Sequence, residues 1–343
     1  MDESLQKSSA AARFWPVLKW ISVGIVMIFV GRRAIELWKS APRESVSING
    51  LWLIPAGLIY FVGWLPSVWF WRALLRAMRQ PVSWSDAIRA YYVGNMGKYV
   101  PGKALVLVIR ATILKESGVS AMLAGTTACY ETLVFMATGT TLALALSAAF
   151  DEAFWTQLPW PLHGFHGHPY LIFLTVIFAE FVTTPFSAWL FTQVGRKSMA
   201  RNSSDAGPAP AISAALMCQG IVATSLGWAC HALSLGCVLQ SVSSRPIEFA
   251  QFPIWLEACT TSVVGGFVIL IAPGGIGVRE GLLIETLKDQ PHIGPTTAIL
   301  AAGLLRAVWF AAELVAAGVL YFTRKRSLRG SNQPGSDGLH GSQ

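Results

Sequence analysis

Two stretches of the sequence place charged side chains directly beside residues that break helices. In residues 272–280, an apolar run ends in a proline and three glycines before Arg279 and Glu280. Open backbone at membrane depth must line a cavity, because lipid offers it no hydrogen bonds. A helix that restarts near Val278 would point the free N–H groups and the positive dipole end of its first turn into that cavity. This pattern predicts a binding site for an anionic head group.

The second stretch, residues 97–103, has a Pro-Gly break between two lysines, and the apolar run behind it ends in Arg110. Interrupted hydrophobic segments in corresponding halves of a transporter indicate its substrate site. We therefore expect the two breaks to form one site. The candidate substrate-binding residues at the breaks are Lys98, Tyr99, Lys103, Arg110, Gly274, Gly275, Gly277, Arg279 and Glu280.

Three more candidates, Glu131, Arg306 and Glu313, fall inside predicted membrane segments. An unpaired charge near mid-bilayer costs about 2.5–3.5 kcal/mol, so these residues must be paired, hydrated or close to the interface. Arg306 and Glu313 are two helical turns apart on one face and can point into the same interior. Arg279 and Glu280 project differently, so we expect Arg279 to meet another acid or a ligand. The alternative is that acids such as Glu131 and Glu313 form structural ion pairs.

Composition identifies an integral membrane protein. Hydrophobic residues make up 53% of the chain and charged residues 13%, against about a quarter charged in soluble domains. The net charge of +8 comes largely from Lys and Arg near the ends of apolar segments, which favours contact with anionic lipid over nucleic acid. The five cysteines lack zinc spacing, and Ala104 replaces the Ser or Thr of a phosphate-binding loop. We expect no metal, nucleotide or redox cofactor.

The apolar runs predict an all-α polytopic protein of six to eight membrane segments. Residues 15–325 form the transmembrane domain, with a flexible cytoplasmic linker at about 195–210 between its halves. Residues 1–14 and 326–343 are polar, and we expect them to be disordered. The predicted full spans are 15–31, 51–75, 119–150, 169–194, 211–242 and 294–322.

The basic residues determine how many segments cross. Eight Lys or Arg between residues 72 and 115 place that region in the cytoplasm, and the basic tail at 324–326 should share that side. A re-entrant hairpin over residues 251–290 satisfies this rule and leaves both termini cytoplasmic in the inner (plasma) membrane. The run at 104–109 is too short to span, so the first break also predicts a re-entrant segment. The two breaks would then approach a central polar cavity from opposite faces.

The breaks read Gly-Lys-Tyr-Val-Pro-Gly-Lys at 97–103 and Pro-Gly-Gly-Ile-Gly-Val-Arg-Glu at 273–280. They resemble the signature segments of the lysylphosphatidylglycerol synthase transmembrane-region family, the flippase-like domain of the multiple peptide resistance factor. The resemblance covers roughly residues 15–325. It implies an all-helical domain that, in the best-understood members, moves a modified phospholipid between leaflets; other members are tied to polyprenyl-linked sugars.

Two differences from the family stand out. The chain has no soluble synthetase domain after residue 325, so we expect it not to aminoacylate lipid. Thr132 follows Glu131 where many relatives carry an arginine, which leaves the partner of that acid open.

We expect a lipid flippase-like protein rather than an enzyme, translocating or binding an anionic or aminoacylated phospholipid or a polyprenyl-linked lipid. The lysines of the first break and Arg279 would neutralise the lipid phosphate. When no lipid is bound, Glu131, Glu280 and Glu313 would pair with these cations. A cationic head group would use those acids directly. The alternatives are an intramembrane transferase on a lipid phosphate, with Glu131 or Glu280 as general base, and a non-catalytic partner of a separate lipid-modifying enzyme.

Overall fold

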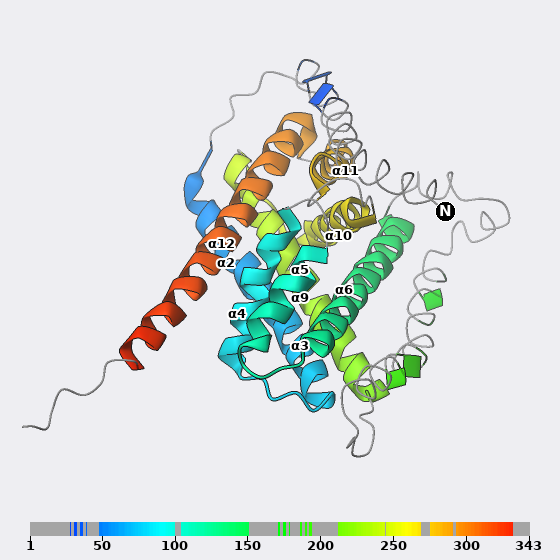
Figure 1. The fold of residues 1–343 in the computed structure, drawn as a ribbon. Coiled ribbons are helices and arrows are strands. Elements are labelled where there is room, and N and C mark those ends of the chain that lie inside the picture. The colour runs from blue at the N-terminus through cyan, green and yellow to red at the C-terminus, as the bar shows by residue number, and fades with distance from the viewer. Residues whose placement is uncertain are drawn as a thin grey trace, which may run out of the picture.

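Four long apolar helices dominate the structure, a computed structural model (Figure 1). By length and composition these helices can cross a membrane, and the rest of the described chain is also helical or in turns. The all-α membrane architecture predicted from the sequence is confirmed. The structure describes residues 48–99, 104–150, 212–243, 245–268, 275–290 and 293–331, with isolated positions between 28 and 39 and between 171 and 193.

The long helices coincide with four of the predicted spans. The first consists of α2 (Leu53–Gly63) and α3 (Leu65–Ala77), which meet at Trp64. Pro66 stands in the first turn of α3, where its missing N–H costs no hydrogen bond. The other three are α6 (Ala121–Phe150), α9 (Ala214–Val242) and α12 (Gly294–Ser331).

Several predicted segments lie outside the described residues. These are the N-terminal region, most of the predicted span at 169–194, and the linker. At the other end, α12 continues past residue 325, where the sequence predicts disorder, as far as Ser331. Arginine and lysine are good helix formers and are favoured near a helix C-terminus, so the basic tail extends the helix.

Each helix-breaking stretch joins two short helices that pack side by side. The first hairpin consists of α4 (Trp84–Asn95), a 3-10 turn (Met96–Tyr99) and α5 (Ala104–Lys115). The second consists of α10 (Phe252–Val268) and α11 (Val278–Leu287). The helices before and after each stretch are therefore neighbours in space, as a re-entrant segment requires. Their depth in the bilayer remains a prediction.

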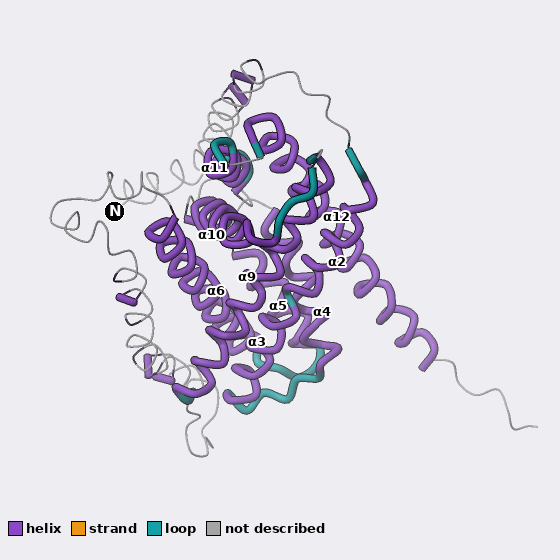
Figure 2. Tube along the Cα trace, turned by 180° about the vertical axis from the view of Figure 1, so that it is seen from behind, coloured by secondary structure: helices purple, strands orange, loops and turns teal. Residues whose placement is uncertain are grey.

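Helix α9 lies at the centre of the molecule and packs against α2, α3, α6, α10 and α12. In both views α6 and α12 lie on opposite sides of it (Figures 1 and 2). The largest core cluster lies along α9 and includes Trp228, which stacks on Phe135 of α6 with ring centroids 4.3 Å apart. This core fixes the helices that surround the two hairpins.

Candidate lipid head-group site

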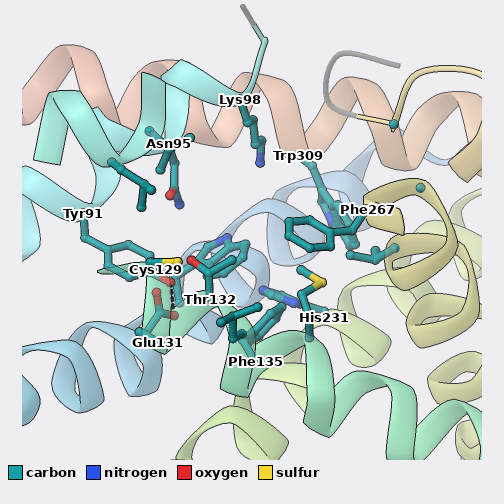
Figure 3. A pocket seen from close by; sticks show the side chains of 18 of the residues that line it. Tyr91, Asn95, Lys98, Cys129, Glu131, Thr132, Phe135, His231, Phe267 and Trp309 are labelled. Carbon is teal, nitrogen blue, oxygen red and sulfur yellow. Dashed lines mark hydrogen bonds between the residues drawn. The ribbon is translucent and has the colours of Figure 1, made fainter. Parts of the chain in front are cut away.

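A cavity of about 380 Å³ lies where the two hairpins meet α2, α6, α9 and α12. Lys98 of the first hairpin lines the cavity, as do Gly275 and Arg279 of the second. Figure 3 shows side chains from several different helices reaching toward this common space. Most of the remaining wall is apolar, including Leu133 and Phe267. The cavity thus combines a few charges with a surface that suits hydrocarbon.

Lys98 is held to α12 by Glu313. The Lys98 Nζ and the Tyr60 hydroxyl both donate to Oε1 of this carboxylate, and the Tyr99 hydroxyl donates to Oε2 at 2.9 Å. Glu313 is buried, with 2% of its surface exposed, although it does not line the cavity itself. Glu313 therefore fixes the turn of the first hairpin beside the cavity.

Arg110 and Glu131 form a second buried pair, 3.0 Å apart. Tyr91 donates to the other carboxylate oxygen at 2.9 Å, and Arg110 donates to Asn95 Oδ1 at 2.9 Å. The guanidinium lies 3.7 Å from the centroid of the Tyr91 ring. Arg110 is thus the partner of Glu131 that the sequence left open.

The stem of Arg110 lies directly on a glycine. A Cβ at Gly94 would lie 2.5 Å from Arg110 Cγ, closer than side-chain atoms approach one another. The absence of a side chain at Gly94 lets α5 bring its arginine against α4. Nearby, a Cβ at Gly97 would lie 2.7 Å from the backbone nitrogen of Val106, so the hairpin is closed by contact between its two arms.

Glu280 caps α11 and faces Arg306. It accepts a 2.7 Å hydrogen bond from the Gly277 N–H, and its other oxygen lies 3.6 Å from Arg306 Nε. The positive φ angles of Gly275 (+70°) and Gly277 (+84°) explain why glycines restart this helix, since other residues are strained there. Glu280 and Arg306 lie in a small pocket next to the main cavity, which Arg279 also lines.

Arg279 differs from the other three cations. Its stem passes between two glycines: a Cβ at Gly266 would lie 2.2 Å from Arg279 Cγ, and one at Gly275 2.8 Å from Cδ. The guanidinium carbon lies 5.4 Å from the centroid of the Trp309 ring. Among the residues that the structure describes, no carboxylate lies within 4 Å of its nitrogens. The acid that the sequence offers as a partner for Arg279 is thus not found there, and a ligand is the other expectation.

The charges of this region do not cancel. Three acids face four cations, and each acid is engaged by a different cation, which leaves the described part of the site with one net positive charge on Arg279. The pairs are Lys98 with Glu313, Arg110 with Glu131, and Arg306 with Glu280. Of the predicted site residues, Lys103 and Gly274 lie outside the described residues. Five predicted residues do not line the main cavity: Tyr99, Gly277, Glu280, Arg306 and Glu313. Of these, Glu313 accepts hydrogen bonds from Lys98 and Tyr60, which do line it, while Glu280 and Arg306 lie in the adjoining pocket.

Several cavity residues were not predicted. His231 and Asn95 were detectable, because each is a polar residue among apolar helical neighbours. His231 lies among the rings of Tyr60, Trp64 and Trp309 at centroid distances of 5.0, 4.7 and 5.5 Å. The aromatic residues gave no such signal, since tryptophan and tyrosine also occur at membrane interfaces for reasons unrelated to a site.

The fold and the cavity define a class: a polytopic helical membrane protein with a charged site between two helical hairpins. Residues 18–317 match the family model described as "Lysylphosphatidylglycerol synthase TM region". The chain therefore belongs to this family, as the two motifs predict, and the match associates it with lipid handling. A comparison with curated proteins found no significant match.

Proposed function

We propose that the protein binds the phosphate of an anionic membrane lipid at Arg279 and moves that lipid between the two leaflets. The observation that carries the proposal is an arginine that has no acid partner among the described residues and lies in the wall of a largely apolar cavity. An arginine presents a planar fork of N–H donors that matches two phosphate oxygens at once. Arg279 is half-buried, so water screens its charge less than at a fully exposed position.

Lys98 is the second phosphate contact in this proposal. It lines the cavity and shares Glu313 with two tyrosines. When a phosphate draws Lys98 away, the hydroxyl groups of Tyr60 and Tyr99 still satisfy the carboxylate. The lysine can therefore exchange partners while the buried carboxylate keeps two hydrogen bonds, which reduces the cost of leaving its charge unpaired.

The geometry favours this reading over a transferase. A general base needs a free oxygen within reach of the proton it removes. Both oxygens of Glu131 are engaged by Tyr91 and Arg110, and Glu280 caps its own helix while facing Arg306. We therefore propose a carrier rather than an enzyme. Its place in the inner membrane with both termini cytoplasmic, and a separate lipid-modifying enzyme as partner, remain predictions from the sequence.

The test is a leaflet-resolved assay in proteoliposomes with fluorescent phosphatidylglycerol. Wild-type protein should accelerate flipping, Arg279→Ala should abolish it, and Arg279→Lys should retain part of it, because the lysine keeps the charge but loses the fork. Arg245→Ala is the matched control, since Arg245 is exposed and lies outside the cavity. Equal flipping by wild type and Arg279→Ala would reject the proposal.

A further inference from the structure

Each carboxylate in the described part of the site already forms hydrogen bonds or an ion pair with other groups of the protein. Glu131 accepts from Tyr91 and Arg110 at 2.9 and 3.0 Å. Glu313 accepts from a lysine and two tyrosines. Glu280, in the adjoining pocket, is engaged by the Gly277 N–H and faces Arg306. No negative charge in the described part of the site is left for a ligand.

Three of the aromatic rings that line the cavity already face a cation of the protein. An ammonium not paired with a carboxylate binds over a tryptophan or tyrosine ring within about 6 Å. Here Arg279 already lies over Trp309 at 5.4 Å. Lys98 lies over Trp64 at 5.9 Å, and Arg110 lies over Tyr91 at 3.7 Å. A cationic ligand over any of these three rings would have to displace one of the protein's own cations.

Most of the polar atoms in the cavity wall that lack a hydrogen-bond partner are donors rather than acceptors. Three such atoms are buried and have no partner among the described residues: Trp64 Nε1, Asn95 Nδ2 and Arg110 Nε. All three can only donate. His231 Nε2 also lacks a partner, and its neutral ring can donate or accept. Such groups are stabilised by an incoming acceptor oxygen, provided that the wall moves enough to expose them.

From these observations we infer that the site selects lipid head groups built of acceptor oxygens, namely a phosphate with hydroxyl or ester groups, and rejects head groups that carry an ammonium. The inference rests on the proposed function and narrows its substrate class. An ammonium placed here would meet three cavity cations, and the one carboxylate that lines the described part of the wall, Glu131, is already paired with Arg110. Like charges brought together without counter-charge are a means of excluding a ligand.

The test compares three short-chain lipids on the full-length protein in detergent, by native mass spectrometry. These are phosphatidylglycerol, its lysyl ester, and the lysyl ester with both amines acetylated, which removes both positive charges and is at least as large as the lysyl ester. Phosphatidylglycerol should bind at least about tenfold more tightly than the lysyl ester, a difference of about 1.4 kcal/mol. The acetylated ester should recover most of that loss.

Two variants sharpen the test. Tyr99→Phe frees the second oxygen of Glu313 with little change in shape. It should reduce the difference in affinity between phosphatidylglycerol and its lysyl ester. Lys98→Met removes a cation and leaves Glu313 with hydrogen bonds from the two tyrosines alone, so it should narrow the difference in affinity more. Binding of the lysyl ester to wild type as tight as that of phosphatidylglycerol overturns the inference alone. Binding of neither lipid overturns the proposed function with it.

Discussion

Each of the two hairpins holds one arginine against a glycine of its partner helix, but only one of the two arginines is paired with an acid among the described residues. Arg110 of α5 lies on Gly94 of α4, and Arg279 of α11 lies on Gly266 of α10. Each guanidinium also lies over an aromatic ring. The difference comes from the third helix. Opposite Arg110, α6 supplies an acid, Glu131, whereas opposite Arg279, α12 supplies an aromatic ring.

This comparison separates a structural charge from a binding charge. Arg110 and Glu131 are almost completely buried, at 3% and 1% side-chain exposure, and they satisfy each other. The interpretation of Glu131 as part of a structural ion pair therefore fits the geometry well. Arg279 has no such partner among the described residues, so its charge is available to a ligand. The local motif is shared, and the neighbouring helix decides its role.

The largest expected effect is on stability at the first hairpin. Arg110→Ala leaves Glu131 as an uncompensated buried charge and should cost about 3–5 kcal/mol. Arg279→Ala removes no ion pair and should change stability by less than about 1 kcal/mol, as substitutions that break no buried network usually do. Thermal unfolding of both variants in the same detergent measures the contrast. The double variant Arg110→Met/Glu131→Gln should recover much of the loss, and equal melting of the two single variants would remove the distinction.

The glycines under the arginines give a second contrast. An added methyl at Gly94 or Gly266 collides with the arginine stem, and overpacking of this kind costs about 1–3 kcal/mol. Gly266→Ala should in addition slow lipid flipping, because it moves Arg279. Gly125→Ala on α6 is the control, since nothing lies within 4 Å of its Cβ position, and it should be neutral or stabilising. Flipping at the wild-type rate by Gly266→Ala would show that the position of Arg279 is not critical.

A smaller effect is expected where the second hairpin restarts. Gly277 has φ +84°, a conformation that costs other residues roughly 1–2 kcal/mol. Gly277→Ala should lower the unfolding temperature modestly and disturb the Glu280 cap, so Glu280→Gln should show part of the same loss. Circular dichroism melts report both. If Gly277→Ala melts as the wild type does, the left-handed turn is not required for the helix to restart.

Much of the architecture could be predicted from sequence because it depends on local chemistry. Apolar runs of sufficient length predicted the four described long helices, and each Pro-Gly break predicted that a helix ends before it and another begins after it. The ion pairs could not be predicted. Lys98 and Glu313 are 215 residues apart, and only the packing of the first hairpin against α12 brings them together. Nothing local in the sequence distinguishes Arg110, which pairs with an acid, from Arg279, which pairs with none among the described residues.

The central claim is that Arg279 is the cation left for an anionic lipid. Native mass spectrometry of the full-length protein with phosphatidylglycerol tests it most directly, with thermal unfolding of each sample as the control for folding. Arg279→Ala should bind the lipid about 10- to 100-fold more weakly, the loss expected for a charge-assisted hydrogen bond of about 1.5–3 kcal/mol, while melting as the wild type does. Undiminished lipid binding by a folded Arg279→Ala variant would contradict the account.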